Sequence, residues 1–163
     1  MPKIAYIGLG SNSQDKMQML LRARILINIC IAPIQAKSDI YCTEPWGFAE
    51  QEEFINQVVS IRTNMPPSEL LSSLYHIERL LDKRKSKHRY GPRNIDLDIL
   101  IYDNIIMDQE GLHIPHPRMH ERNFVLIPLA EIAPDLVHPL FNRSITDLLE
   151  GCKDQGMVKV YTN

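Results

Sequence analysis

Two aspartates in an otherwise apolar stretch are the residues of this sequence best suited to bind a metal. Asp96 and Asp98 alternate with Ile95, Leu97 and Ile99. Because side chains of a β-strand alternate between its two faces, both carboxylates are expected on one face. Like charges roughly 7 Å apart repel each other, and Mg²⁺ held by the two carboxylates and by substrate phosphates would relieve that repulsion. The spacing alone also fits a plain amphipathic strand with a solvated acidic face.

A basic segment precedes these carboxylates. From Arg79 to Arg93 the chain carries seven positive charges and one negative charge, Asp82, a net +6 within a protein of net charge −2. Cations beside an acidic metal-binding pair are the arrangement that phosphoryl transfer needs, because negative charge spreads over the transferred oxygens. Taken alone, the segment also fits a solvated basic helix end. No aromatic-rich RNA-binding motif accompanies it, so a nucleic-acid partner is not expected.

Length and composition favour one folded domain over residues 1–163, with 44% hydrophobic and 23% charged residues. No apolar run is long enough to cross a bilayer, and the first residues resemble a strand more than a secretory signal. The three cysteines, Cys30, Cys42 and Cys152, lack metal-ligand spacing. These features predict a cytoplasmic protein with reduced thiols and no membrane partner.

The elements that must position these residues follow from the apolar pattern. Strands are expected over residues 3–9, 36–43, 54–63, 95–102 and 157–161. Helices are expected from Asp15 to before Pro33, from Ser68 into the basic segment, and over residues 120–130 and 144–149. In the first helix the apolar positions are Met17, Leu20, Leu21, Ile25 and Ile29. Because strands and helices mix without strict alternation, we expect an α+β fold with a largely antiparallel sheet and helices packed on its faces.

Several other kinds of site are not supported. The sequence lacks a P-loop, the third glycine of a dinucleotide fingerprint and a G-x-S-x-G nucleophile motif. His113, His116 and His120 match no familiar zinc spacing and are interrupted by two prolines. These histidines are expected to be exposed or to contact phosphate.

Residues 89–100, RYGPRNIDLDIL, strongly resemble the signature of the 6-hydroxymethyl-7,8-dihydropterin pyrophosphokinase family. Supporting segments lie along nearly the whole chain: Gly10-Ser11-Asn12, residues 43–47 (TEPWG), residues 54–56 (FIN), and Pro115-His116 with Arg122 and Phe124. The resemblance implies a single-domain α+β sandwich that transfers pyrophosphate from ATP to the pterin hydroxymethyl group in folate biosynthesis, giving AMP. It also implies two Mg²⁺ ions.

The resemblance further assigns roles to individual residues. Asp96 and Asp98 would hold the metal ions, and the catalytic cations would be Arg93 and Lys83. ATP would contact Glu78, Lys85, Arg89, Arg93, His116 and Arg122. The pterin would contact Thr43, Glu44, Trp46, Phe54, Asn56 and Phe124, with the two phenylalanines sandwiching its flat ring. By pattern alone Phe54 and Phe124 would instead be core residues, and Glu78 a surface charge.

The sequence departs from the family at residues 82–85, where Asp-Lys-Arg-Lys replaces the usual G-R-x-R. Lysines stand at the two arginine positions, so positive charge is kept there but the bidentate hydrogen bonding of a guanidinium group is lost. The loops 44–53 and 83–92 are long enough to act as lids over ATP. We expect a monomer that binds ATP and hydroxymethyldihydropterin. Two alternatives remain at this point: a non-catalytic binder of nucleotide or RNA through the basic segment, and a different Mg²⁺-dependent nucleotidyl or glycosyl transferase that uses the aspartate pair.

Overall fold

The computed structural model describes residues 1–43, 53–82 and 94–162. The strands in chain order are β1 Lys3–Ser11, β2 Ile34–Lys37, β3 Tyr41–Thr43, β4 Phe54–Thr63, β5 Asp96–Tyr102, β6 Met107–Gln109, β7 Leu112–Ile114, β8 Val137–His138, β9 Arg143–Ser144 and β10 Val158–Val160. The helices are α1 Lys16–Cys30, α2 Pro67–Leu81, the short 3₁₀ turn η1 Met119–Glu121, α3 Asn123–Ile132 and α4 Ile145–Glu150. No helix of these described ranges is long and apolar enough to span a bilayer.

The main sheet has six strands, and every pairing found in it is antiparallel. Its order is β10-β3-β4-β1-β5, and β2 pairs with β4 beside β3. β1 and β4 are the longest strands and lie side by side at the centre, so they provide the floor to which the other elements are attached. β6 with β7, and β8 with β9, form two small separate hairpins.

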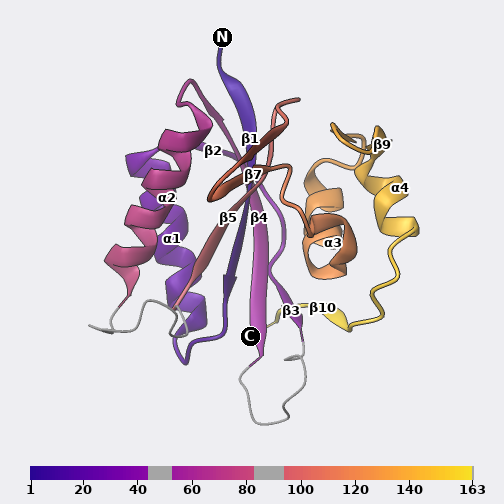
Figure 1. The fold of residues 1–163 in the computed structure, drawn as a ribbon. Coiled ribbons are helices and arrows are strands. Elements are labelled where there is room, and N and C mark those ends of the chain that lie inside the picture. The colour runs from indigo at the N-terminus through magenta and orange to yellow at the C-terminus, as the bar shows by residue number, and fades with distance from the viewer. Residues whose placement is uncertain (44–52, 83–93, 163) are drawn as a thin grey trace.

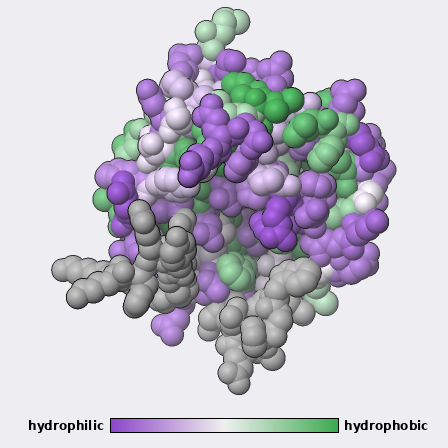
Figure 2. Space-filling model, viewed as in Figure 1, coloured by the Kyte–Doolittle hydropathy of each residue, from purple (hydrophilic) through white to green (hydrophobic). Residues whose placement is uncertain are grey.

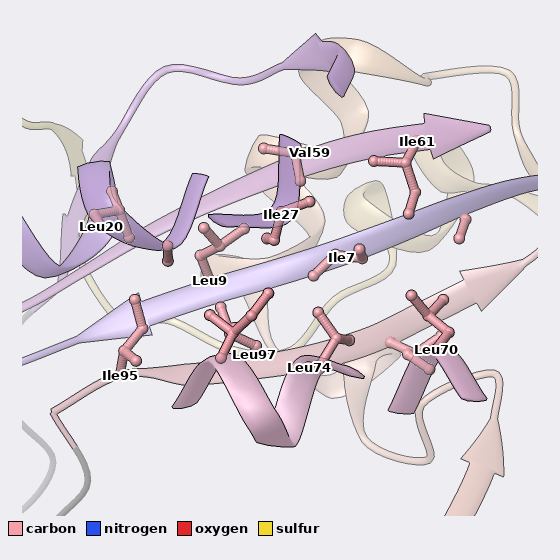
Figure 3. Packing of buried hydrophobic residues seen from close by; sticks show 14 of the residues in the cluster. Ile7, Leu9, Leu20, Ile27, Val59, Ile61, Leu70, Leu74, Ile95 and Leu97 are labelled. Atoms are coloured by element: carbon pink, nitrogen blue, oxygen red, sulfur yellow. The ribbon is translucent and has the colours of Figure 1, made fainter. Parts of the chain in front are cut away.

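The two faces of the sheet are covered by different helices, α1 and α2 on one side and α3 and α4 on the other (Figure 1). Figure 3 shows side chains of α1 and α2 packed among those of β1, β4 and β5, including Leu20, Ile27, Leu70 and Leu74. A second, smaller cluster with Leu126 of α3 and Ile145 of α4 lies on the opposite face. The molecular face seen in Figure 2 is mostly hydrophilic, with smaller hydrophobic patches, because the two clusters hold most of the large apolar side chains.

The antiparallel α+β architecture predicted from the sequence is confirmed, with one strand divided. Residues 36–43 were expected to form a single strand, and the structure has β2 and β3 instead. Ser38 lies at the break, where its hydroxyl accepts a hydrogen bond from Val58 N (3.0 Å) and its carbonyl accepts one from Gln57 Nε2 (2.7 Å). These side-chain hydrogen bonds replace regular ladder bonds and let β2 and β3 pair with different halves of β4.

Not all the apolar positions named for the first helix are buried in α1. Leu21, Ile25 and Ile29 are 39%, 56% and 73% exposed, whereas the buried positions include Met19 and Ala23. Apolar residues occur all round this helix, so periodicity does not single out the face that packs. The hairpins of β6–β7 and β8–β9 were not expected either, because strands of two or three residues carry too little pattern.

Replacing Leu74 should show how much of the stability comes from the α2 side of the sheet. Leu74 is completely buried, so Leu74→Ala removes apolar contacts and leaves a cavity. We expect the free energy of unfolding, measured by urea denaturation, to fall by about 2–5 kcal/mol. Leu80 lies on the same helix and is 57% exposed, so Leu80→Ala is the matched control, with a change of about 0.5 kcal/mol or less. Equal losses in the two variants would contradict the packing described above.

Candidate functional site

The register of the neighbouring strands β4, β1 and β5 places the two predicted metal ligands in successive rows of residues that run across the sheet. Asp96 of β5 lies opposite Gly10 of β1, and Gly10 lies opposite Asn56 of β4. One step further along, Asp98, Gly8 and Val58 form the next row. Residues directly opposite each other project from the same face, so both aspartates share a face with Asn56.

The two glycines at the centre of these rows leave the floor between the aspartates and Asn56 open. A Cβ atom added to Gly10 would lie 2.9 Å from Oδ1 of Asn56, closer than real Cβ atoms approach an oxygen. At Gly8 an added Cβ would make an ordinary contact, 3.4 Å from Cδ2 of Leu100. Gly10 is therefore required for the close approach of the Asn56 amide to the middle strand.

A cavity of about 520 Å³ lies over this floor. Most of its lining residues come from β1, β4, β5, the loop after β7 and the start of α3. They are Gly8, Leu9, Gly10, Thr43, Phe54, Asn56, Gln57, Val58, Asp96, Asp98, Leu100, His116, Arg118, Glu121, Arg122, Phe124, Val125 and Asp154. Eight of the predicted site residues are among them: Thr43, Phe54, Asn56, Asp96, Asp98, His116, Arg122 and Phe124.

The segment from His116 to Arg122 supplies basic groups that face the acidic floor. The backbone N–H of His116 donates to the carbonyl of Leu100 (2.8 Å), which fixes the start of this segment against β5. Arg118 lies 3.8 Å from Glu121, so its charge is partly balanced. The cavity therefore has carboxylates on the sheet and cations on the segment that covers it.

His116 is neutral at physiological pH. Burial, together with the positive charges of Arg122 and Arg118, lowers its pKa to about 4. Its Nδ1 atom accepts a hydrogen bond from the backbone N–H of Arg118 (3.2 Å). A neutral imidazole that accepts at Nδ1 carries its proton on Nε2, so Nε2–H is a donor suited to a phosphate oxygen.

Arg122 stands between the acidic floor and the aromatic part of the cavity. Burial and the nearby Arg118 lower the pKa of its guanidinium, whereas Asp98 and Glu121 raise it. The Cζ atom of Arg122 lies 5.7 Å from the centre of the Phe124 ring, a cation–π distance. Arginine remains protonated despite such a shift, so Arg122 brings a fixed positive charge to the Asp98 side of the cavity.

Four of the predicted pterin contacts, Thr43, Phe54, Asn56 and Phe124, line another part of the cavity. Phe54 begins β4 and Phe124 lies in the first turn of α3; both are half-buried and line the cavity. The Asn56 amide donates to the hydroxyl of Thr43 (3.4 Å), the residue that ends β3. This part of the cavity thus offers aromatic faces next to an amide and a hydroxyl.

Not every predicted site residue is found at this cavity. Glu78 is 8% exposed on α2, which packs on the other face of the sheet, and it does not line the cavity. Glu44, Trp46, Lys83, Lys85, Arg89 and Arg93 lie outside the described residues. Of the three histidines, only His116 lines the cavity, while His113 pairs with Asp108 (2.7 Å) and His120 packs edge-on against Phe141.

Three charged lining residues were not predicted from the sequence: Arg118, Glu121 and Asp154. Arg118 and Glu121 lie within the same short segment as His116 and Arg122, so proximity in the chain was a signal for them. Asp154 approaches the cavity through hydrogen bonds to Asn123, 31 residues earlier, and nothing local in the sequence indicates that contact.

The donor set fits magnesium better than a transition metal. Among the described residues, no group of three or more His, Cys, Asp or Glu side chains is arranged to hold a metal ion. Asp96 and Asp98 are both exposed at the cavity floor and offer oxygen ligands only. Mg²⁺ prefers such sites, since one or two carboxylates suffice when substrate phosphates and water supply the other ligands.

Comparison with known proteins identifies the family. The sequence model of the 7,8-dihydro-6-hydroxymethylpterin-pyrophosphokinase (HPPK) family matches residues 6–134. The chain belongs to this family. A 2-amino-4-hydroxy-6-hydroxymethyldihydropteridine pyrophosphokinase of Bacillus subtilis is 45% identical over 133 residues, which cover 81% of this chain and 79% of that protein. The family and enzyme class predicted from the signature at residues 89–100 are thereby confirmed.

Some relatives are much longer than this chain. The folic acid synthesis protein fol1 of Schizosaccharomyces pombe is 37% identical over 162 residues, which are 99% of this chain but only 22% of that protein. The structure of a triple mutant of Plasmodium falciparum HPPK-DHPS with SDX-DHP has a TM-score of 0.76 and 18% sequence identity, covering 93% of this chain and 44% of that one. The HPPK fold thus also occurs as part of larger chains.

The lowered pKa of His116 predicts an acid-sensitive stability. The unfolded imidazole takes up its proton near pH 6.5, whereas the folded one does so near pH 4. Between these values the unfolded state binds more protons, so the free energy of unfolding should fall as the pH is lowered from 6.5 to 4. His116 contributes at most about 1.4 kcal/mol per pH unit to this loss.

Urea denaturation at several pH values measures the slope, and NMR titration locates the pKa of the imidazole. His116→Asn removes the titrating group, so its slope should be smaller than that of the wild type. His138 is 1% exposed, and burial lowers its pKa to about 4, so it should account for part of the slope that remains. An imidazole of His116 that titrates near pH 6.5 would contradict the prediction.

Proposed function

We propose that the chain transfers pyrophosphate from ATP to 6-hydroxymethyl-7,8-dihydropterin in an Mg²⁺-dependent reaction, giving AMP and the pterin diphosphate. One observation carries this proposal. A single cavity combines the Asp96–Asp98 pair, the cations of the segment from His116 to Arg122, and the aromatic pair Phe54 and Phe124. Membership of the HPPK family supports the same reaction. The substrates and the metal are assigned here on these two grounds.

In this proposal the aspartates hold Mg²⁺ and the triphosphate. Asp96 and Asp98 would hold two Mg²⁺ ions. These ions would screen the negative charge of the triphosphate and polarise its β-phosphorus. Arg122 would balance negative charge on the phosphates, and Nε2–H of His116 would donate to a phosphate oxygen. The pterin hydroxyl oxygen would then bond to the β-phosphorus and lose its proton to water. The bond between that phosphorus and the α–β bridging oxygen would break, so that AMP leaves with the bridging oxygen.

The pterin would occupy the aromatic part of the cavity. Its flat ring would bind between Phe54 and Phe124, because offset stacking suits aromatic faces. The Asn56 amide would hydrogen-bond the amide-like edge of the pterin, with Thr43 supporting its orientation. Fixing both substrates over one floor converts an encounter between two molecules into a reaction within one complex.

Further residues belong to the proposal through family resemblance. Arg93 and Lys83 are proposed as catalytic cations, Lys85 and Arg89 as additional ATP contacts, and Glu44 and Trp46 as pterin contacts. Glu78 is not included, because α2 places it on the other face of the sheet. Arg93 precedes Asp96 by only three residues in the chain. Since the triphosphate carries several negative charges, clustered cations beside the metal-binding pair favour its binding.

Incubation of the protein with ATP, Mg²⁺ and hydroxymethyldihydropterin, followed by product separation, tests the proposal directly. AMP and pterin diphosphate are expected in equal amounts, and their absence would falsify the proposed function. Release of pyrophosphate or a nucleoside diphosphate would indicate a different transferase. Binding of single-stranded RNA without Mg²⁺, together with an inactive protein, would favour the non-catalytic alternative.

Removing one metal-binding carboxylate should abolish most turnover without unfolding the chain. We expect kcat of Asp96→Ala to fall about 10³-fold, since charge stabilisation at the phosphates is lost. Asp103 is exposed in the turn directly after the same strand, 4.0 Å from Lys3, and provides the matched control. Asp103→Asn keeps a residue that tolerates the positive φ of 51° and should retain wild-type activity. Full activity of Asp96→Ala would rule out the metal role.

Gly10→Ala tests whether the Asn56 amide recognises the pterin. The added Cβ would lie 2.9 Å from Oδ1 of Asn56 and displace the amide. We expect the KM for pterin to rise about tenfold, the effect of losing one well-formed hydrogen bond, while the KM for ATP changes little. Gly151→Ala is the control, because its Cβ would make an ordinary contact 3.5 Å from the carbonyl of Asp147, away from the cavity. An unchanged pterin KM in Gly10→Ala would argue against this use of Asn56.

A further inference from the structure

Asp154 connects the C-terminal segment to the start of α3 through a compact set of hydrogen bonds. Its Oδ2 accepts from the backbone N–H of Asn123 (3.1 Å), and its Oδ1 accepts from the backbone N–H of Gly156 (2.9 Å). In return, the Asn123 side-chain amide donates to the carbonyls of Asp154 (3.3 Å) and Gly156 (2.7 Å). We call these three residues the α3 clamp; Asn123 is 9% exposed, so its contacts are largely shielded from water.

The clamp supplies what the N-terminus of α3 lacks. The first N–H groups of a helix have no partner within the helix, and a side chain at the N-cap usually binds one of them. Here the N-cap is Arg122, whose side chain makes no capping hydrogen bond. The carboxylate of Asp154 takes this role from 31 residues away, and its negative charge is favourable at the positive end of the helix dipole.

The same segment also reaches the other side of the cavity. After the clamp the chain forms β10, in which Val158 pairs with Thr43 of β3. The C-terminal segment therefore runs from its contact with α3 to β10, which lies beside β3 (Figure 1). α3 carries Phe124 and β3 carries Thr43, and both residues line the aromatic part of the cavity.

We propose that Asp154 is a positioning residue for the pterin side of the site: it fixes the first turn of α3 and thereby the ring of Phe124. This inference rests on the proposed function. Phe124 follows the clamped Asn123 directly in the chain, so the orientation of its ring depends on the first turn being held. Asp154 acts through Phe124 and does not take part in the transfer itself.

The ATP side depends less on the clamp. The backbone N–H of Arg122 donates to the carbonyl of Met119 (3.3 Å), which anchors it to the preceding turn. The negative charge of Asp98, which lies on the sheet and outside the clamp, also raises the pKa of the Arg122 guanidinium and so favours its charged form. Loss of the clamp should therefore weaken pterin binding more than ATP binding.

The test compares Asp154→Ala and Asp154→Asn with the wild type in steady-state kinetics and in calorimetric binding of pterin in the presence of Mg²⁺ and a non-hydrolysable ATP analogue. For Asp154→Ala we expect the KM and Kd for pterin to rise about tenfold, equivalent to about 1.4 kcal/mol, with the ATP values changed about twofold or less. Asp154→Asn keeps one carbonyl acceptor, so its KM and Kd for pterin should lie between those of the wild type and those of Asp154→Ala. Amide hydrogen exchange at Asn123 and Phe124 should become faster in Asp154→Ala, whether or not the protein is active.

Two further variants make the outcome decisive. In Gly156→Ala the new Cβ would lie 3.0 Å from Oδ1 of Asp154, so this change disturbs the clamp while keeping the carboxylate, and it replaces Asp154→Ala if that variant does not fold. Asp135→Asn removes an exposed charge beyond the other end of α3 and should leave both affinities unchanged. Equal losses in pterin and ATP affinity, or a lower Tm with no change in the KM for pterin, would overturn the positioning role. A wild type that forms no AMP would overturn the proposed function instead, and the exchange rates would still report on the clamp.

Discussion

The antiparallel register of β1 with its two neighbours is the constraint on which the site depends. It sets Asp96, Gly10 and Asn56 in one line across the sheet, although they come from three separate parts of the chain. A shift of one residue would turn the carboxylates toward the apolar cluster on the other face, where burying two negative charges would be very costly. The register is secured by the opposite side chains of the same strands, such as Ile7 and Leu97, which pack under α1 and α2 (Figure 3). The core thus determines which face is left for the chemistry.

The glycines of β1 have a purpose only within this register. Any side chain at Gly10 would meet the Asn56 amide, and a side chain at Gly8 would reduce the space between Asp98 and Leu100. A strand interior with two glycines is weaker than one with β-branched residues, so the sheet gives up some local stability to keep its centre bare. The flanking strands compensate, because β1 is paired along both edges.

How much of this site could be predicted from the sequence depended on how far apart in the chain the interacting residues lie. Asp96 and Asp98 were predicted from strand alternation, which is local and holds in β5. Phe54 and Phe124 fit a buried core by pattern, and only the family resemblance indicated a site; the structure leaves both half-buried at the cavity. Asp154 was not predicted, because its contacts with α3 join residues 31 positions apart in the chain, with α4 between them. The buried face of α1 could not be predicted from the sequence pattern either, because several of its faces are equally apolar and packing against the sheet selects one.

The helix α3 shows how the second face of the sheet serves both packing and the site. Its inner residues, Leu126 and Leu129, are completely buried against the sheet and α4, so the position of the helix axis is fixed by apolar contacts. Apolar packing does not fix its first turn, where the backbone groups need hydrogen-bond partners that the helix itself cannot provide. Phe124 lies in this turn, and in the proposal above the polar contacts there determine how its ring meets the cavity, whereas Arg122 is anchored to Met119 of the preceding turn. Stability of α3 and geometry of the site therefore have separate physical origins, and a substitution at this turn can change the geometry while leaving the packed helix in place.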